Sequence, residues 1–163
     1  MRYAIEQRRK ENNVVTVDNC RSAIVYYVGT MTDPLFDFTD KTVLITGGSR
    51  GMGRAMALAF AERGANIVVA SRKIEACQAV ALEVEALGRQ ALPVACHVAK
   101  WDDIGRLVDE SYERFGKIDV LINNAGLGGT RLLVDMPDDE WSRVLDVTLT
   151  GTMRMTRAML KYM

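Results

Sequence analysis

The sequence predicts an α/β protein in which helices cover both faces of a parallel β-sheet. Short segments that are apolar throughout alternate along the chain with longer segments whose apolar residues recur at helical spacing. The connections between these segments are short, as expected when each helix packs back onto the sheet. A glycine-rich turn also stands directly between the first strand and the first helix, where open α/β sheets bind nucleotides.

The predicted elements follow one another in a regular order. A strand that is apolar throughout is typical of a parallel sheet, because such a strand is buried on both faces. The strands are expected at residues 42–45, 66–71, 90–96 and 118–123. The helices are expected at residues 52–63, 73–87 and 101–115, each ending just before a glycine. This succession predicts a sheet of strand order 3-2-1-4, the N-terminal part of a Rossmann fold.

The turn at residues 46–53 is the first candidate site. Gly47 permits a tight turn, and Gly51 and Gly53 allow close approach of a phosphate and close packing of helix on strand. Free backbone N–H groups and the positive end of the helix dipole converge there, which favours a dinucleotide pyrophosphate. A P-loop is excluded, because Arg and Ala follow Gly53 where that motif needs Lys and then Ser or Thr. The alternative is an ordinary glycine-rich turn without a ligand.

A second motif, Asn123-Asn124-Ala125-Gly126, ends the fourth predicted strand. With the glycine turn in register upstream, the chain from about residue 36 onward resembles the short-chain dehydrogenase/reductase family. The resemblance implies a nicotinamide dinucleotide cofactor, with the Asn-Asn-Ala-Gly segment bracing the sheet and its small residues lining the ribose and nicotinamide side. The residues then expected to bind the cofactor are Gly47, Ser49, Arg50, Gly51, Met52, Gly53, Ser71, Arg72, His97, Val98, Asn124, Ala125 and Gly126. The alternative for the second motif is a plain turn at a strand end.

The residues after the second strand favour NADP over NAD. An NAD site usually has an Asp or Glu there to accept from the ribose 2′-OH. Here Ser71, Arg72 and Lys73 fill that place, and no carboxylate appears before Glu75. Two cations at a helix N-terminus oppose the helix dipole, but they would hold a 2′-phosphate well, and Arg50, inside the glycine turn, can approach the same phosphate. The alternative is solvated surface charge.

His97 is the single histidine of the chain and follows the third predicted strand. Members of the resembling family often carry an Asp there that touches the adenine amino group, so His97 is expected to contact the adenine. The alternative is an ordinary surface residue. One histidine without cysteine or carboxylate partners at ligand spacing predicts no metal site.

The last predicted helix begins with Asp138, Asp139 and Glu140, acidic residues that suit a helix N-terminus. Residues at helical spacing then predict an inward face that includes Thr148. The resemblance implies an Asn at this position, which supports a proton relay through a bound water. Thr148 is therefore the catalytic candidate of this chain, and the alternative is a packing residue.

The resemblance also implies a catalytic Ser and a Tyr followed four positions later by Lys, so that both side chains lie on one helix face. None of the five tyrosines is followed by Lys at that spacing. The chain is therefore expected to be an oxidoreductase for carbonyls or secondary alcohols that is truncated before its Ser and Tyr-x-x-x-Lys, and to be inactive by itself. The alternative is a non-catalytic dinucleotide-binding fragment or pseudoenzyme that binds the cofactor or a partner subunit. Only the loop at residues 127–133 would border a substrate.

The domain organisation predicted from the sequence has two parts. Residues 1–35 are interpreted as an N-terminal extension, flexible or from an upstream mis-start, ahead of a truncated dinucleotide-binding domain at residues 36–163. The extension holds the apolar run 22–28, which is too short to span a membrane, and it can equally be an added strand or a docking arm. The fourth strand is expected to become a sheet edge that invites aggregation.

Composition excludes some partners. Lys plus Arg and Asp plus Glu number 21 each, so the formal net charge of +0 gives no electrostatic case for nucleic acid or an anionic membrane. Three widely spaced cysteines are typical of a reducing cytoplasm. The resemblance implies a small-molecule substrate and a homo-oligomeric full-length protein.

Overall fold

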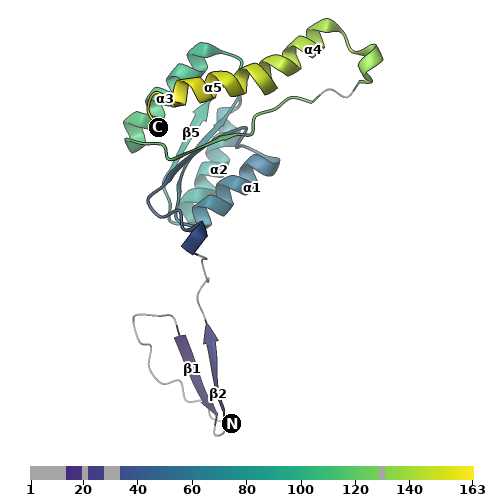
Figure 1. Cartoon of the computed structure of the whole chain (residues 1–163). Helices are drawn as coiled ribbons and strands as arrows, with labels where there is room; N and C mark the ends of the chain where they lie inside the picture. Colours follow the sequence, from purple (N-terminus) through teal and green to yellow (C-terminus); the bar gives the residue numbers. More distant parts are fainter. Residues whose placement is uncertain (1–13, 20–21, 28–33, 129–130) are drawn as a thin grey trace. The chain divides into compact units, whose positions relative to one another are not determined.

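The computed structural model describes residues 14–19, 22–27, 34–128 and 131–163. The chain divides into two compact units, residues 1–36 and 37–163. In the first, β1 (Val14–Asn19) pairs antiparallel with β2 (Ser22–Tyr27), so that Val14 lies opposite Tyr27 (Figure 1). Much of the predicted N-terminal extension lies outside the described residues, and its role stays a prediction.

The second unit is built on the predicted parallel sheet. Its strands are β3 (Thr42–Thr46), β4 (Asn66–Ser71), β5 (Ala91–Ala95) and β6 (Val120–Asn123). They lie in the order β5-β4-β3-β6 and every neighbouring pair is parallel, which confirms the predicted order 3-2-1-4. Thr46 at the end of β3 lies opposite Ala70 of β4 and Asn123 of β6, so the carboxyl ends of the strands meet at one edge.

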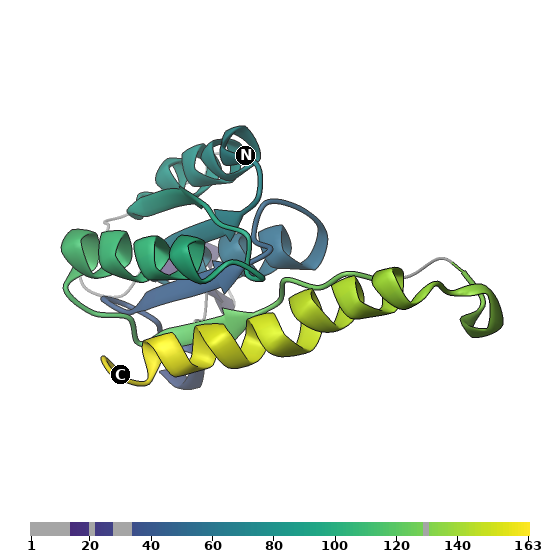
Figure 2. The same ribbon diagram turned by 90° about the horizontal axis from the view of Figure 1, so that it is seen from above.

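Helices cover both faces of this sheet (Figure 2). The first three are α1 (Gly51–Glu62), α2 (Ile74–Ala86) and α3 (Trp101–Phe115), each within one residue of its predicted bounds. Successive residues of a strand point to opposite faces. On β3, Val43 and Ile45 therefore pack with α1 and α2, whereas Leu44 packs with α3 and the last helix. Two apolar clusters result, one on each side of the sheet.

The last predicted helix is not regular throughout. It consists of α4 (Asp138–Leu145), a π-helical segment η3 (Asp146–Thr150) and α5 (Gly151–Met159), which follow one another without a break. Short 3-10 turns lie at η1 (Pro34–Phe36) and η2 (Leu133–Asp135). Figure 2 shows that α5 lies against the sheet and that α4 extends beyond it. The helix is thus packed only at its C-terminal half.

The prediction that Thr148 faces inward is wrong, because its side chain is exposed. Trp141 is 48% exposed as well, whereas Met155 and Met159 on α5 are fully buried as expected. Two features explain the difference. The π turn adds residues to one turn and rotates the helix face on either side of it, and α4 has no sheet beneath it.

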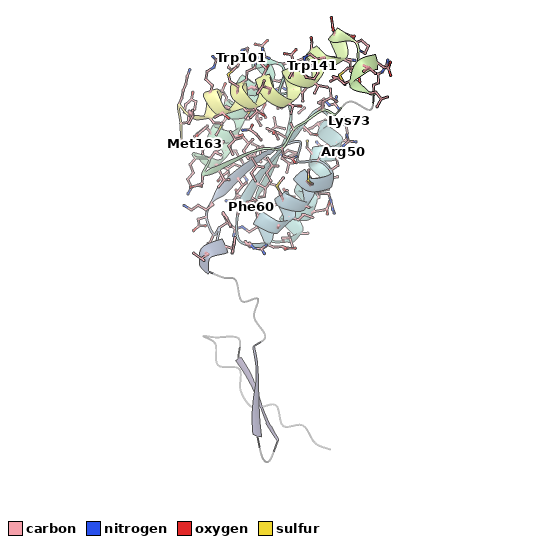
Figure 3. All side chains as sticks on the ribbon, turned by 45° about the vertical axis from the view of Figure 1, so that its right-hand side comes forward. Arg50, Phe60, Lys73, Trp101, Trp141 and Met163 are labelled. Atoms are coloured by element: carbon pink, nitrogen blue, oxygen red, sulfur yellow. The ribbon has the colours of Figure 1, made fainter. Side chains whose placement is uncertain are left out.

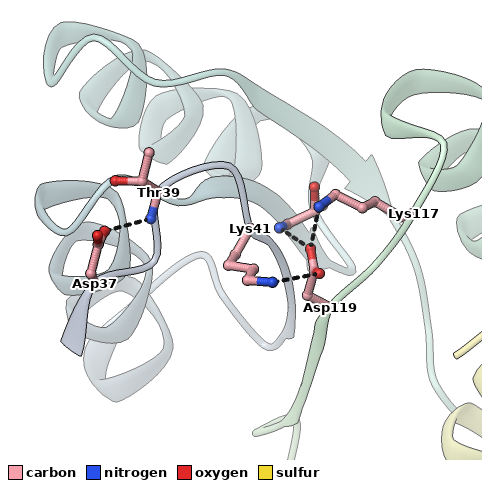
Figure 4. A network of polar contacts seen from close by, with 6 residues as sticks. Asp37, Thr39, Lys41, Lys117 and Asp119 are labelled. Carbon is pink, nitrogen blue, oxygen red and sulfur yellow. Dashed lines mark hydrogen bonds and ion pairs between the residues drawn. The ribbon is translucent and has the colours of Figure 1, made fainter. Parts of the chain in front are cut away.

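The amino ends of β3 and β6 are joined by a charged network around Asp119 (Figure 4). Oδ2 of Asp119 accepts the backbone N–H of Thr42 at 2.8 Å and lies 3.4 Å from the ammonium nitrogen of Lys117, and Oδ1 lies 3.4 Å from that of Lys41. Burial raises the pKa of Asp119, but the Thr42 hydrogen bond and the two lysines outweigh it and hold the pKa below its ordinary value. The network fixes the amino ends of these strands, at the far end from the candidate site.

Candidate functional site

The glycine turn connects β3 to α1 at the carboxyl edge of the sheet. Gly47 and Gly51 have φ values of 67° and 54°, in the left-handed region that glycine adopts without strain. Gly48 donates its backbone N–H to Ala70 O of β4 at 3.2 Å, which ties the turn to the neighbouring strand. A Cβ built on Gly51 would meet no atom within 4 Å, so the backbone there is open to approach from outside.

Gly53 and Gly47 pack directly against each other, with Asn124 beside them. A Cβ on Gly53 would lie 2.6 Å from Asn124 Nδ2 and closer still to the Gly47 carbonyl oxygen. A Cβ on Gly47 would lie 2.9 Å from the same nitrogen. The first turn of α1 therefore approaches the end of β3 as closely as only glycine allows.

Asn124 holds this turn with its side-chain amide. Its Nδ2 donates to the carbonyl oxygens of Thr46 at 3.0 Å and Gly47 at 3.1 Å. The buried Thr46 hydroxyl in turn accepts the backbone N–H groups of Asn124 and Ala125, each at 3.1 Å, and donates to the Ile122 carbonyl oxygen. The Asn124 side chain thus holds the turn by binding the backbone carbonyl oxygens of Thr46 and Gly47. Sequence reasoning missed the part of Thr46, whose only signal is a hydroxyl at the last strand position before the glycines.

The N-terminus of α1 is left open. Its N-cap residue, Arg50, makes no side-chain capping hydrogen bond, and the first turn holds no acidic residue. By contrast, the first turn of α3 holds two acidic residues and that of α4 holds three. The first backbone N–H groups of α1 therefore have neither a capping side chain nor a nearby carboxylate as a partner. They are available to an external anion.

Exposed cations lie at the same edge of the sheet as this open helix end. Arg50, Arg72 and Lys73 are all exposed, and Figure 3 shows Arg50 and Lys73 at the same end of the sheet. Within the described residues, no ion pair joins any of the three to a carboxylate. Arg54, one turn into α1, differs because it pairs with Glu83 of α2 through two hydrogen bonds. The cations at the turn are therefore free to meet a phosphate.

Ser71, at the end of β4, is held from within the protein. Its hydroxyl lies 3.1 Å from the Cys77 sulfur, and its carbonyl oxygen accepts the backbone N–H of Cys96 at 2.9 Å. Burial raises the pKa of the Cys77 thiol, so this sulfur stays protonated and suits a neutral hydrogen bond. The bonds leave Arg72 as the first residue after β4 that projects into solvent.

His97 lies at the turn that follows β5. Its backbone N–H donates to Asp103 Oδ2 at 2.9 Å, and its ring Nδ1 accepts the backbone N–H of Ala99 at 3.2 Å. Val98 is buried, and it packs so closely on Gly151 that a Cβ there would lie 2.9 Å from Val98 Cγ2. The structure therefore brings His97 to the carboxyl edge of the sheet, while the Val98 side chain points into the core.

Thr148 joins the π segment to the chain that follows β6. Its hydroxyl oxygen accepts the backbone N–H of Leu127 at 3.3 Å and donates to Leu127 O at 3.4 Å. Its own carbonyl oxygen accepts the Thr152 hydroxyl at 2.8 Å. Nearby, Asn123 Nδ2 donates to the Thr156 hydroxyl at 3.2 Å, which fixes α5 to β6. The rest of the predicted set is Met52, which is 78% exposed, Ser49, which is half-buried in the glycine turn, and Gly126, which is exposed.

Neither a metal centre nor a membrane span is found where the structure is described. Among those residues, no three His, Cys, Asp or Glu side chains gather as metal ligands would. The same part of the chain contains no helix that combines the length and apolar character needed to cross a membrane.

Comparison with known proteins identifies relatives for most of the chain. A family model described as short chain dehydrogenase matches residues 41–163. A 3-oxoacyl-acyl-carrier-protein reductase of Synechocystis sp. is 40% identical over 126 residues, which are 77% of this chain and 51% of the relative. A reductase of Mycobacterium tuberculosis that acts on a CoA-linked indene derivative is 41% identical over 124 residues, 75% of this chain and 47% of that protein.

Solved structures agree with these relatives. A short-chain type dehydrogenase/reductase from Mycobacterium marinum superposes with a TM-score of 0.76 at 38% identity, covering 78% of this chain and 50% of that one. An NAD+-bound xylitol dehydrogenase superposes with a TM-score of 0.75 at 34% identity, covering 77% and 49%. This chain spans about half the length of the relatives that it matches. The glycine turn, the sheet order and these matches together show that the chain belongs to the short-chain dehydrogenase/reductase family of oxidoreductases.

Proposed function

We propose that this chain binds NADP as the cofactor half of an oxidoreductase that acts on a carbonyl or a secondary alcohol. The observation that carries the proposal is the open N-terminus of α1, where the turn has no room for a Cβ at Gly47 or Gly53 and exposed cations without carboxylate partners lie at the same edge of the sheet. Backbone N–H groups and the helix dipole would hold the pyrophosphate. The nicotinamide would supply or accept the hydride when the cofactor is bound.

The preference for NADP rests on the residues after β4. The Ser71 hydroxyl is hydrogen-bonded to the Cys77 sulfur, and the next two residues, Arg72 and Lys73, are both exposed. No carboxylate stands there to accept from a ribose 2′-OH, whereas a guanidinium matches the geometry of a 2′-phosphate. Arg50, at the N-terminus of α1, adds a third cation at the same edge of the sheet. The NAD+ named for the xylitol dehydrogenase belongs to that protein.

A titration tests the cofactor and its specificity together. NADPH and NADH are added to the purified chain while the fluorescence of the reduced nicotinamide is followed. We expect NADPH to bind more tightly. The variant Arg72→Ala should weaken NADPH binding by roughly 1 to 3 kcal/mol, the range for hydrogen bonds to a charged group, and leave NADH binding nearly unchanged.

A matched control is Arg114→Ala. Arg114 is also an exposed arginine, but it lies in the last turn of α3, away from the carboxyl edge of the sheet. This variant should bind both dinucleotides as the parent chain does. Tighter binding of NADH than of NADPH by the parent chain would overturn the assignment of Arg72, and binding of neither would overturn the proposed function.

A second candidate is a fragment or pseudoenzyme that binds the cofactor or a partner subunit without catalysis. It is favoured by one observation, that no Tyr in the sequence is followed four positions later by Lys. For the chain by itself we expect weak NADP binding and no oxidation of NADPH when carbonyl substrates are added, followed by absorbance. The DNA downstream of the Met163 codon separates the two candidates: a Ser and a Tyr-x-x-x-Lys there, in frame or frameshifted, would favour the oxidoreductase.

The remaining proposals concern the setting of the protein. A reducing cytoplasm suits the cysteines, and a net charge of +0 favours neither nucleic acid nor an anionic membrane as a partner. We propose a small-molecule substrate and a homo-oligomer for the whole protein. Residues 127–133, proposed to border the substrate, lie in part outside the described residues, and Thr148 contacts the first of them, Leu127.

A further inference from the structure

The turn that follows β5, residues 97–100, is held by α3, which begins directly after it, and by α5, the last helix of the chain. Asp103 of α3 accepts the backbone N–H of His97 at 2.9 Å. From α5, Arg154 Nη1 donates to Ala99 O at 2.6 Å, and Gly151 packs on Val98. We call residues 97–100 the β5 turn. Its conformation therefore depends on the last helix as well as on its own sequence.

Arg154 is itself held in place by an aromatic ring. Its guanidinium lies 5.8 Å from the centre of the Trp101 ring, and that of Arg157, one turn later, lies 4.6 Å from the same centre. Cation–π attraction stabilises both positions. In the described part of the chain, however, only Arg154 of this pair donates to the β5 turn. Both arginines thus contact the Trp101 ring, but they differ in the hydrogen bond to Ala99, which Arg154 makes.

The bond to Ala99 has a consequence for the imidazole. Ala99 accepts from Arg154 through its carbonyl oxygen and donates through its N–H to His97 Nδ1 at 3.2 Å. A nitrogen that accepts a hydrogen bond carries no proton, so neutral His97 carries its proton on Nε2. The hydrogen bonds from Arg154 to Ala99 and from Ala99 to His97 therefore select one tautomer of the neutral ring, in which Nε2 is the donor.

The β5 turn lies where the adenine of a bound dinucleotide would reach the edge of the sheet, which would bring His97 Nε2–H close to the base. The glycine turn lies after β3 and would hold the pyrophosphate, and Arg72 after β4 would meet the ribose. The strands lie in the order β5-β4-β3, so the next carboxyl end outward is that of β5. The base is attached to the ribose and reaches that end next. It offers ring nitrogens that accept hydrogen bonds.

We propose that Arg154 is a positioning residue for cofactor binding. It fixes Ala99, and through Ala99 it holds His97 with Nε2–H as the donor to a ring nitrogen of the adenine. The inference rests on the proposed function, because it needs a dinucleotide at the glycine turn. It goes beyond that function by assigning a role to a residue of α5 and a direction to the hydrogen bond made by His97.

The test compares Arg154→Met with Arg157→Met, since Met replaces either guanidinium by an uncharged chain of similar reach. The first readout is the nitrogen NMR spectrum of the imidazole in mildly alkaline buffer, without cofactor. His97 is the single histidine, so one pair of ring-nitrogen signals reports its tautomer. The parent chain and Arg157→Met should both show the Nε2–H form, and Arg154→Met should show a mixture of the two tautomers.

The second readout is binding of NADPH and of 2′,5′-ADP, which contains the adenine half alone. Arg154→Met should weaken both by the same factor, about fivefold, as expected for one lost hydrogen bond. Arg157→Met should bind both as the parent chain does. Thermal melting of each variant shows whether it is folded, and an unfolded Arg154→Met is replaced in both measurements by Arg154→Leu, which also lacks a donor to the Ala99 carbonyl oxygen.

The outcomes separate this inference from the proposed function. If the parent chain binds neither NADPH nor 2′,5′-ADP, the proposed function fails and this inference fails with it. If the parent chain binds them and the Arg154 variant keeps the Nε2–H tautomer and parental affinity, the inference alone is overturned. It is overturned too if Arg157→Met shows the same losses, because the Trp101 contact would then account for both.

Discussion

Gly53 is the glycine at which an added side chain would meet the closest neighbouring atoms. A Cβ there would overlap the Gly47 carbonyl oxygen and lie 2.6 Å from Asn124 Nδ2. We expect Gly53→Ala to lower the free energy of unfolding by about 1 to 3 kcal/mol, since neither neighbour can move without breaking the turn. Urea unfolding followed by circular dichroism measures this change.

Gly105 provides the control. It lies within α3, it is exposed, and a Cβ there would meet no atom within 4 Å. The same change, Gly105→Ala, should raise the free energy of unfolding by about 0.5 to 1 kcal/mol, because alanine favours the helix. Equal effects at the two glycines would mean that the packing of Gly53 on Gly47 is not as close as described.

A second prediction concerns the amide of Asn124. The Asn124 amide donates to two backbone carbonyl oxygens. Asn124→Asp therefore removes both hydrogen bonds and places a carboxylate beside these two oxygens. We expect a loss of about 2 kcal/mol in the free energy of unfolding and weaker NADPH binding. Asn123→Asp is the matched control, because the Thr156 hydroxyl can donate to the new carboxylate. Urea unfolding would refute the prediction if the Asn123 variant proved the less stable.

The buried cysteines give a third prediction at this scale. Burial raises the pKa of Cys77 and raises that of Cys96 to about 12, so both thiols stay protonated at neutral pH. Iodoacetamide should therefore leave both unmodified in the folded chain and modify both in urea, as read by peptide mass mapping. Cys20 lies outside the described residues. Rapid modification of Cys96 without urea would show that the core under β5 opens.

The residues of the candidate site differ in how well their roles can be predicted from residue type alone. The glycines of the turn are predictable, because positive φ and missing space are needs that only glycine meets. The partners of Asn124 are not, since an amide can bind cofactor or backbone and only the fold decides between them. His97 is intermediate: its place after β5 is readable, whereas its bond from Ala99 depends on Arg154, which lies 55 positions after Ala99.

At the scale of the elements, the joined amino ends of β3 and β6 predict a pH dependence. The lowered pKa of Asp119 means that its ionised form stabilises the fold. This contribution is complete above the ordinary carboxyl pKa of 3.8 and is lost as the pH falls through the lower folded value. We expect Asp119→Asn to cost about 1 kcal/mol at pH 7, a figure reduced for solvent screening, and much less near pH 3.

The measurement is urea unfolding of both proteins at the two pH values. Asp37 supplies a control, since its carboxylate is exposed and accepts from Thr39, two positions along the chain, with the Thr39 N–H at 2.9 Å. Asp37→Asn should change stability little at pH 7. A gap between the parent chain and Asp119→Asn that stays constant down to pH 3 would contradict the assignment.

Strands and early helices were accessible to sequence reasoning, because each is either apolar throughout or apolar at one spacing and most end at a glycine. The π segment was not. Residues 146–150 carry no Gly or Pro, and their apolar spacing continues that of the helix on either side. The widened turn arises where α5 packs on the sheet and α4 leaves it, a tertiary condition that periodicity does not contain.

At the scale of the whole molecule, β6 is an edge. In the described part of the second unit it pairs with β3 alone, and its other side has no strand. Apolar side chains are also exposed on the adjoining helix, with Leu149 at 64% and Leu160 at 69%. Open strand edges and exposed apolar residues both favour association.

We therefore expect the chain to self-associate as its concentration rises, measured by sedimentation velocity. Because the net charge is +0 and the exposed groups are apolar, added salt should not disperse the assemblies. Urea below the unfolding midpoint should disperse them. A chain that stays monomeric over a hundredfold range of concentration would show that the open side of β6 is harmless.

The pairing of β3 with β6 also sets an order of events during translation. Thr42 lies opposite Asn66, so β3 and β4 meet soon after leaving the ribosome, but Val43 lies opposite Val120, 77 positions later. Asn124, whose amide holds the glycine turn, emerges later still. One flank of β3 therefore stays unpaired until β6 has been made, and a nucleotide can bind the glycine turn in its final form only after Asn124 has been made.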